Sequence, residues 1–199
     1  MTFATLKTDV ADYLHRTDLT AKMAGFIELA EASIFRELPN IKAMAISVAG
    51  TTTGEYGTLP TDFGSVVRVT ITANSSEWSL DYKAQDYTPT GQAYPEQYAL
   101  ENNKLRIWGS STGQAYTLYY IPNLAALSDS NPTNWLLTNA PDLYQYATAL
   151  EAAKYIKDTN EIQLLAPMVA GLIDSVRRQS ERRGQPISGS MQIKPRRQA

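Results

Sequence analysis

Apolar side chains at the start of the chain recur every three or four residues, a spacing typical of amphipathic helices. The pattern predicts a short helix over residues 5–16 and a longer helix that ends near Leu38. The apolar stripe of the longer helix contains Leu19, Met23, Ile27, Ala30, Ile34 and Leu38. Its N-cap candidates are Thr17 and Asp18. Glu28 and Glu31 lie off the stripe, so we expect both on the solvent-facing side.

Between residues 41 and 121 the pattern changes to short β-branched and aromatic runs separated by Gly, Thr, Asn and Pro. Val67, Val69 and Ile71 alternate with polar residues, which is typical of a half-buried strand in an antiparallel sheet. Residues 101–104 contain two asparagines, which tolerate the positive φ of a hairpin turn. The pattern therefore predicts an antiparallel β-rich insertion between helical segments.

Helical spacing returns after a loop over residues 122–139. Pro141 and Asp142 suit the first turn of a helix, which the pattern extends to about Lys157. That helix is rich in alanine, which favours either close approach of neighbouring helices or simply high helix propensity in a bundle core. A last helix follows and is expected to bend at Pro167. Its stripe contains Ile162, Leu165, Val169, Leu172 and Val176.

Together these elements predict an α+β fold in which a bundle of about four helices is interrupted by an antiparallel β-domain. An extended C-terminal arm is expected to follow the bundle. The expected divisions are 1–40 for the N-terminal helices, 41–121 for the β-rich insertion, 122–184 for the loop and C-terminal helices, and 185–199 for the basic arm. A length of 199 residues suits one compact domain that carries an insertion.

Charge is distributed unevenly along the chain. Residues 177–199 contain seven basic side chains and one acidic side chain, a net charge of +6. The total is -2, so the preceding 176 residues carry -8. An acidic body with a basic end is typical of an interaction tail. A solvated end that only aids solubility explains the same charge.

The composition excludes much of catalytic chemistry. The chain has no cysteine, which excludes disulfides, cysteine–zinc sites and thiol catalysis. His15 is the single histidine, and we interpret it as a cation at the end of the first helix. No phosphate-binding, nucleophile-elbow or zinc-protease motif occurs. We therefore expect no enzyme activity, no cofactor and no metal site. No apolar run has the length of a membrane span, and no secretory signal is apparent at the N-terminus.

Two groups of oxygen-bearing side chains have a chemical alternative to their structural interpretation. Glu28 and Glu31, one helical turn apart, could act as the paired carboxylates of a peptidoglycan-cleaving enzyme, but a solvated helix face explains them better. Residues 129–131 offer oxygen ligands for calcium but lack the twelve-residue loop pattern, so a turn capped by side chains is preferred. Six of the twelve tyrosines cluster near the end of the predicted sheet and the following helix, and we interpret them as core or interface residues in preference to base-stacking residues: Tyr116, Tyr119, Tyr120, Tyr144, Tyr146 and Tyr155.

Several short motifs lie in the loops and at the element ends. Residues 128–137 read Ser-Asp-Ser-Asn-Pro-Thr-Asn-Trp-Leu-Leu, and residues 139–144 read Asn-Ala-Pro-Asp-Leu-Tyr. Residues 59–63 read Leu-Pro-Thr-Asp-Phe, and residues 119–122 read Tyr-Tyr-Ile-Pro. With the Ile-x-x-Ala-Glu-x-x-Ile-x-Arg-x-Leu pattern of residues 27–38, these motifs make the chain resemble the head-to-tail adaptor proteins of tailed bacteriophages, with those of short-tailed phages as the nearest match. The resemblance extends from residue 5 to about 180.

The resemblance implies a structural virion protein that forms a ring, usually of twelve copies, in the neck between the capsid portal and the tail. The implied partners are the portal protein, tail nozzle or tube proteins and further copies of the chain, with assembly in the host cytoplasm. The ring helps to seal and conduct packaged DNA, which passes through the lumen without sequence-specific contact. Members of the family typically contact the portal through C-terminal segments.

Two candidate contact regions follow. The portal- or neighbour-binding candidates are Arg177, Arg178, Arg182, Arg183, Lys194, Arg196 and Arg197. The candidates for a loop at the subunit boundary are Asp129, Asn131, Pro132 and Trp135. Trp135 is expected either to anchor that boundary or to fill the core of its own bundle. The alternative function is a nucleic-acid-binding module that acts through the basic C-terminal arm.

Overall fold

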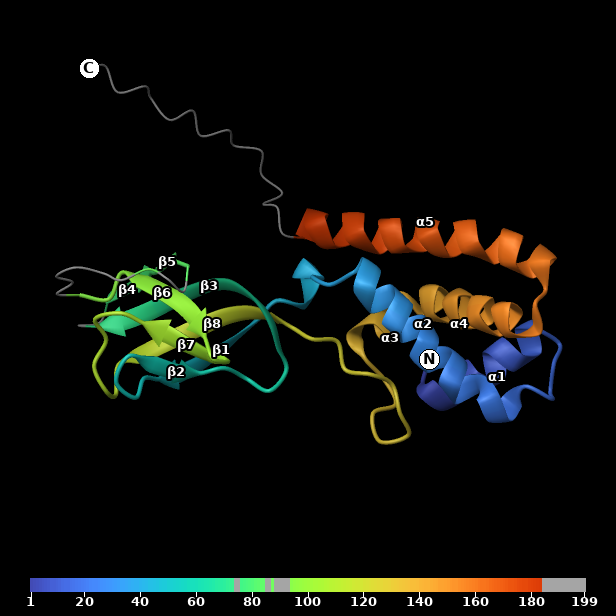
Figure 1. Cartoon of the computed structure of the whole chain (residues 1–199), viewed down its shortest axis with the longest axis horizontal. Coiled ribbons are helices and arrows are strands. Elements are labelled where there is room, and N and C mark those ends of the chain that lie inside the picture. Colours follow the sequence, from blue (N-terminus) through green and yellow to red (C-terminus); the bar gives the residue numbers. More distant parts are fainter. Residues whose placement is uncertain (74–75, 85–86, 88–93, 184–199) are drawn as a thin grey trace, which may run out of the picture.

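The computed structural model describes residues 1–73, 76–84, 87 and 94–183. This part of the chain forms a mixed α+β fold, with helices gathered at one end of an elongated molecule and strands at the other (Figure 1). The helices are α1 (Phe3–Tyr13), α2 (Met23–Glu37), α3 (Trp135–Asn139), α4 (Pro141–Ile156) and α5 (Thr159–Arg183). Two short 3-10 turns are η1 (Thr20–Lys22) and η2 (Lys42–Met44). None of the described helices is both long and apolar enough to span a bilayer.

Helix α4 lies at the centre of the helical end and packs against α1, α2 and α5. Its alanines are buried on more than one face, which lets two neighbouring helices approach it closely. The buried alanines are Ala147, Ala149, Ala152 and Ala153. They belong to one hydrophobic cluster, called the helical core below, with the buried faces of α1, α2 and α5.

The start of α2 differs from the sequence-based prediction. The helix begins at Met23, because residues 20–22 form the 3-10 turn η1. Asp18 does not cap it: the Asp18 carboxylate instead accepts two hydrogen bonds of 2.7 Å from the guanidinium of Arg16. An exposed, bidentate ion pair with Arg16 therefore engages the Asp18 carboxylate, and the chain enters α2 without a side-chain cap.

The strands form two four-stranded sheets with the orders β1-β8-β3-β4 and β2-β7-β6-β5. Their bounds are β1 (Ile46–Thr51), β2 (Tyr56–Thr58), β3 (Phe63–Ala73), β4 (Ser76–Ser79), β5 (Asp81–Tyr82), β6 (Gln97–Glu101), β7 (Lys104–Ile107) and β8 (Ala115–Pro122). A second hydrophobic cluster contains buried side chains from both sheets. The pairs are antiparallel as predicted, except that the short β5 pairs with β6 in parallel.

Two predictions within the β-rich part have different outcomes. Asn102 and Asn103 have φ angles of 48° and 59° and join β6 to β7, which confirms the predicted hairpin turn. The predicted burial of Val67 is wrong, since its side chain is 53% exposed. The pairing of β3 with β8 is irregular between Val66 and Arg68, and such a bulge reverses the alternation of faces. Only the later positions of the predicted stripe, such as Val69, face the β core.

Helix α5 runs as one helix through Pro167. Leu165, Val169 and Val176 of its predicted stripe are buried, and so is Ile173, which the prediction missed. The short helix α3 lies inside the segment predicted as a loop, because five residues are too few to show a periodic pattern. The expected arm, residues 185–199, lies outside the described residues.

Candidate assembly surfaces

Three of the residues predicted for the subunit-boundary loop lie in the segment 123–134 between β8 and α3, and the fourth, Trp135, begins α3. The segment folds back on itself. The side-chain amide of Asn131 donates to the carbonyl oxygen of Ala126 over 2.7 Å. The Ser128 hydroxyl accepts a hydrogen bond from the backbone N–H of Asn131 over 3.0 Å. This closed turn is the side-chain-capped structure expected for residues 129–131.

The same segment is attached to the N-terminal end of α1. The backbone N–H of Phe3 donates to the carbonyl oxygen of Pro132 over 2.7 Å. The ammonium group of Lys7 lies 3.4 Å from the carboxylate of Asp129, which is an exposed and therefore weak ion pair. The main-chain contact fixes the position of Pro132 relative to α1.

Glu31 is the residue that departs most from the sequence analysis. It was expected on the solvent face of α2, but it is 4% exposed. Its Oε1 atom accepts hydrogen bonds of 2.9 Å from the backbone N–H of Leu127 and from the Tyr144 hydroxyl. The prediction is wrong because the loop and α4 cover this part of α2. A signal was present: Glu31 follows Ile27 by four residues, the spacing of the buried face.

Asn134 connects this polar cluster to the start of α3. Its Nδ2 atom donates to the Tyr144 hydroxyl over 2.7 Å and to the carbonyl oxygen of Ala125 over 2.9 Å. Its Oδ1 atom accepts from the backbone N–H of Leu137 over 2.8 Å, which makes Asn134 the N-cap of α3. We call Glu31, Asn134 and Tyr144 the buried polar network. It joins α2, the loop, α3 and α4 through three side chains.

Burial shifts the ionisation of this network. Desolvation raises the pKa of the Glu31 carboxyl and the charge of Glu28 adds to the rise, while the hydrogen bonds from Leu127 and Tyr144 oppose it. Desolvation also strongly raises the pKa of the Tyr144 hydroxyl, which therefore stays neutral and can donate its proton to Glu31. A carboxylate held by two donors acts here as a structural acceptor.

Trp135 is the first residue of α3, directly after the Asn134 cap. Its side chain is partly buried and packs against the helical core, and the next two residues, Leu136 and Leu137, are fully buried. The cap therefore sets where Trp135 enters the core. Of the other loop candidates, Asp129 and Pro132 are exposed and Asn131 is partly exposed.

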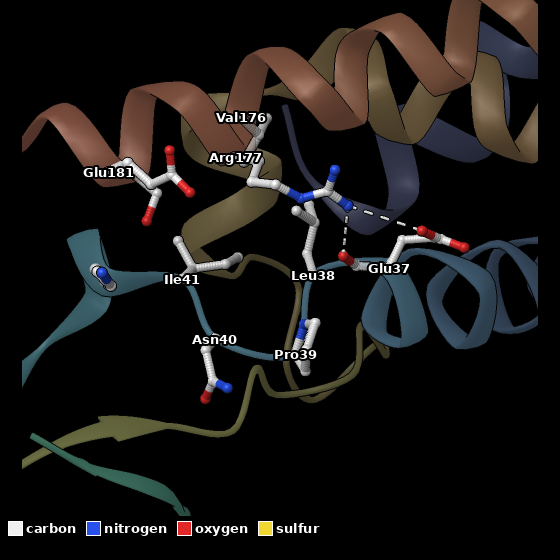
Figure 2. A pocket seen from close by; sticks show the side chains of 10 residues that line it. Glu37, Leu38, Pro39, Asn40, Ile41, Val176, Arg177 and Glu181 are labelled. Atoms are coloured by element: carbon white, nitrogen blue, oxygen red, sulfur yellow. Dashed lines mark hydrogen bonds and ion pairs between the residues drawn. The ribbon is translucent and has the colours of Figure 1, made fainter.

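The predicted basic candidates fall into three groups. Arg178 and Arg182 are exposed on α5, and Arg183 is the last residue of that helix. Lys194, Arg196 and Arg197 lie outside the described residues. Arg177 is engaged within the chain, where its guanidinium donates to the Asp174 carboxylate over 2.7 Å. It also donates to the carbonyl oxygen of Glu37 over 3.0 Å (Figure 2). Arg177 therefore ties α5 to the end of α2.

A pocket of about 200 Å³ lies beside this contact, between α5 and the segment that leads from α2 to η2 (Figure 2). Its walls include Leu38, Pro39 and Val176. Farther along α5, the Ser180 hydroxyl accepts a hydrogen bond from the backbone N–H of Ala43 over 3.3 Å. Helix α5 thus holds the connection between the helical end and β1 at two points.

The described residues contain no group of three or more His, Asp or Glu side chains that could hold a metal ion. His15 is exposed just after α1, with a φ of 50°. Glu28 and Glu31 do not form an exposed acid pair, because Glu31 is buried and hydrogen-bonded to Leu127 and Tyr144. The hydrogen bonds described above hold the 123–134 segment and the helices in place.

Comparison with known proteins gives a match to a protein-family model. The model described as SU10 adaptor protein matches residues 1–191. No curated protein matches the chain.

Proposed function

Since that match covers almost its whole length, the chain belongs to the SU10 adaptor protein family of bacteriophage head-to-tail adaptors, and we propose that it works as a ring between portal and tail. Membership makes it a structural virion protein of the neck and implies contact with portal and tail proteins. The family suggests a role without catalysis. The proposal adds that the ring contains twelve copies, assembles in the host cytoplasm, and seals and conducts the packaged DNA.

The observation that carries the proposal is the extent of the match, which includes every described element from α1 to α5. The buried polar network supports it. A loop that is already fixed loses little conformational entropy when it enters an interface, so it suits contacts repeated in every copy. On this basis Asp129, Asn131, Pro132 and Trp135 lie at or near the subunit boundary.

The division of the chain follows from the same proposal. Residues 1–40 and 122–184 form the helical part, residues 41–121 form the β-rich part, and residues 185–199 form the arm. Lys194, Arg196 and Arg197 of the arm contact acidic surface on the portal or on a neighbouring copy. The residues before 177 have a net charge of -8, which would let DNA slide through the lumen without adhering.

The basic candidates on α5 have different parts in this proposal. Arg178, Arg182 and Arg183 join the arm in contacting acidic surface. The intramolecular contacts of Arg177 with Asp174 and Glu37 make Arg177 a residue that positions α5. Those contacts also weaken the nucleic-acid-binding alternative, because the Arg177 guanidinium already pairs within the chain and is not free to bind a nucleic-acid phosphate.

The test compares binding of the full-length protein to its portal ring and to duplex DNA over a range of salt concentrations. We expect stable portal binding at physiological salt, because such interfaces use shape and apolar area as well as charge. The alternative predicts DNA binding whose logarithm falls linearly with the logarithm of salt, by about 0.9 per phosphate neutralised. DNA binding of that kind without any portal binding would contradict the proposed ring.

A further inference from the structure

Helix α5 lies along one edge of the helical end and presents three different faces (Figure 1). Leu165, Val169, Ile173 and Val176 face the helical core. The remaining surface has two flanks of different composition. Both flanks are exposed, and together they give α5 the means to contact two neighbours at once.

The first flank is a continuous stripe along the helix. It consists of Leu164, Met168, Gly171, Ser175, Arg178 and Arg182, at successive spacings of four and three residues. Leu164 is 54% exposed and Met168 is 39% exposed, so the N-terminal half of the stripe is apolar. Arg178 and Arg182 make its C-terminal half basic. We call this stripe the α5 ridge.

The second flank borders a groove between α5 and α2, with a volume of about 310 Å³. Ala166 and Ala170 of α5 and Ser33 of α2 are small residues on its walls, and the edges of Val169 and Ile173 make its floor apolar. We call it the α2/α5 groove.

Beyond its apolar part, this flank is acidic. Glu37 and Asp174 line the C-terminal end of the groove, and Glu181 lies about two turns beyond Asp174 along α5. Figure 2 shows Glu181 and Arg177 extending from α5 towards the chain that follows α2. Arg177 is paired here with Asp174 and Glu37. Lys42 lines the pocket beside Glu181, so three acidic side chains face two basic ones. The flank therefore keeps a net negative charge.

Along α5, the ridge and the groove flank both change from apolar to charged residues in the same direction. Apolar ridge residues 164 and 168 overlap in height with the N-terminal part of the apolar groove residues 166–173. Arg178 lies between the heights of Asp174 and Glu181, and Arg182 lies level with Glu181. The two flanks are separated by about 120° around the helix, from the helical repeat of 3.6 residues per turn. One copy can therefore offer its ridge to one neighbour and its groove to the other.

We propose that the α5 ridge of one copy packs into the α2/α5 groove of the next copy, so that a head-to-tail row of α5 helices forms the ring contact. This inference rests on the ring proposed above and identifies the surface that closes it. Contacts between two different surfaces generate rings, whereas self-complementary surfaces generate dimers. Ridge-to-ridge pairing is disfavoured: parallel ridges would set the arginines against each other, and antiparallel ridges would set them against Leu164 and Met168.

A charge-reversal mixing experiment tests this contact on assembled portal complexes. One variant reverses the ridge (Arg178→Glu with Arg182→Glu), and the other reverses the flank of the groove (Asp174→Lys with Glu181→Lys). The Asp174–Arg177 pair is exposed, and Arg177 keeps its hydrogen bond to the Glu37 carbonyl oxygen, so the variant should lose little stability. Each variant alone should lose the ring, because like charges then meet at every contact. An equal mixture should recover it as an alternating ring, since acidic ridges meet basic grooves and basic ridges meet acidic grooves.

The matched control reverses two exposed lysines on other surfaces, Lys104→Glu with Lys157→Glu, and should assemble like the wild-type protein. If either α5 variant assembles alone as well as the wild type, or the mixture fails, the α5 contact is wrong while the adaptor ring still stands. If the wild-type protein itself forms no ring on the portal, both the ring and this contact are wrong. Retained circular dichroism spectra of the variants exclude misfolding.

A cross-linking experiment gives a second readout that leaves the charges unchanged. Because the chain has no cysteine, Met168→Cys with Ala170→Cys introduces the only two thiols. Residues two apart on a helix do not face each other, which makes a bond within the copy unfavourable. A short bis-maleimide should join copies into a ladder that ends at the closed ring, while either single variant should give no ladder. Ladders from the single variants, or none from the double variant, would contradict the contact.

Discussion

Replacing Asn134 with alanine is expected to lower the free energy of unfolding by about 2–4 kcal/mol, because a cap and two further hydrogen bonds are lost together. The substitution removes the acceptor for the Leu137 N–H and the donors to Ala125 and Tyr144. Tyr144 is fully buried, so water cannot replace the hydrogen bond that its hydroxyl accepts from Asn134. Urea denaturation with an unchanged slope measures the loss.

The matched control for this substitution is Asn139→Ala. Asn139 is the exposed last residue of α3, and its side-chain amide donates to the carbonyl oxygen of Trp135, the first residue of the helix. We expect this variant to lose no more than about 0.5–1 kcal/mol. Equal losses at the two positions would show that the buried polar network adds nothing to an ordinary surface contact.

Glu31→Gln separates the hydrogen bonds of the network from its charge. Glutamine keeps an oxygen acceptor for Leu127 and Tyr144 but carries no charge to bury. Burial raises the pKa of Glu31 in the folded protein. The Glu31 carboxyl therefore makes its full contribution to the free energy of unfolding at low pH, where it is protonated, and loses that contribution as pH rises through the raised pKa. The variant should therefore be at least as stable as wild type at pH 7, with a difference that shrinks as pH falls. A difference that grows as pH falls would contradict the assignment.

Gly57→Val should destabilise the β-rich part by about 1–3 kcal/mol, because it overpacks a closed space. A Cβ atom at Gly57 would lie 2.7 Å from the Tyr116 ring. The ring cannot move away, since a Cβ at Gly50 on β1, which pairs with the Tyr116 strand β8, would meet the same ring at 2.6 Å. The Tyr116 hydroxyl is also held by the carbonyl oxygen of Thr58 at 3.0 Å. Thermal or urea unfolding measures the effect.

Two further variants make this prediction specific. In a Tyr116→Ala background the Gly57→Val substitution should cost much less, because the clashing ring is gone; an unchanged cost would contradict the clash. Gly25→Ala is the control in a helix: nothing lies within 4 Å of its Cβ position, so alanine should stabilise α2 by about 0.5–1 kcal/mol.

Local patterns in the sequence predicted the elements whose structure depends on nearby residues. The stripe of α5 and the Asn102–Asn103 turn follow from helical spacing and from the positive φ that asparagine tolerates. Glu31 was misplaced because its burial depends on Leu127 and Tyr144, about a hundred residues later in the chain. The burial of Val67 was mispredicted because a β-bulge, which leaves no periodic signal in the sequence, reverses which side chains of the strand face the core.

The candidate contact regions show the same limit. Family resemblance, not spacing, drew attention to residues 128–137, and it did not indicate that Asn134 joins a cap to the buried polar network. Charge identified the basic residues of α5 but could not separate Arg177, which pairs within the chain, from Arg178 and Arg182, which stay exposed. Asp174 precedes Arg177 by three residues on α5, so this pair is local, whereas Glu37 of α2 becomes a neighbour of Arg177 only in the fold.

The most direct test of the proposed role is the mass of the complex formed when the purified protein is added to portal rings. We expect the mass to increase by a whole number of chains, twelve at saturation, and to stay at that value when more protein is added. A protein that remains monomeric in the presence of the portal, or that binds in a number that never saturates, would contradict the ring.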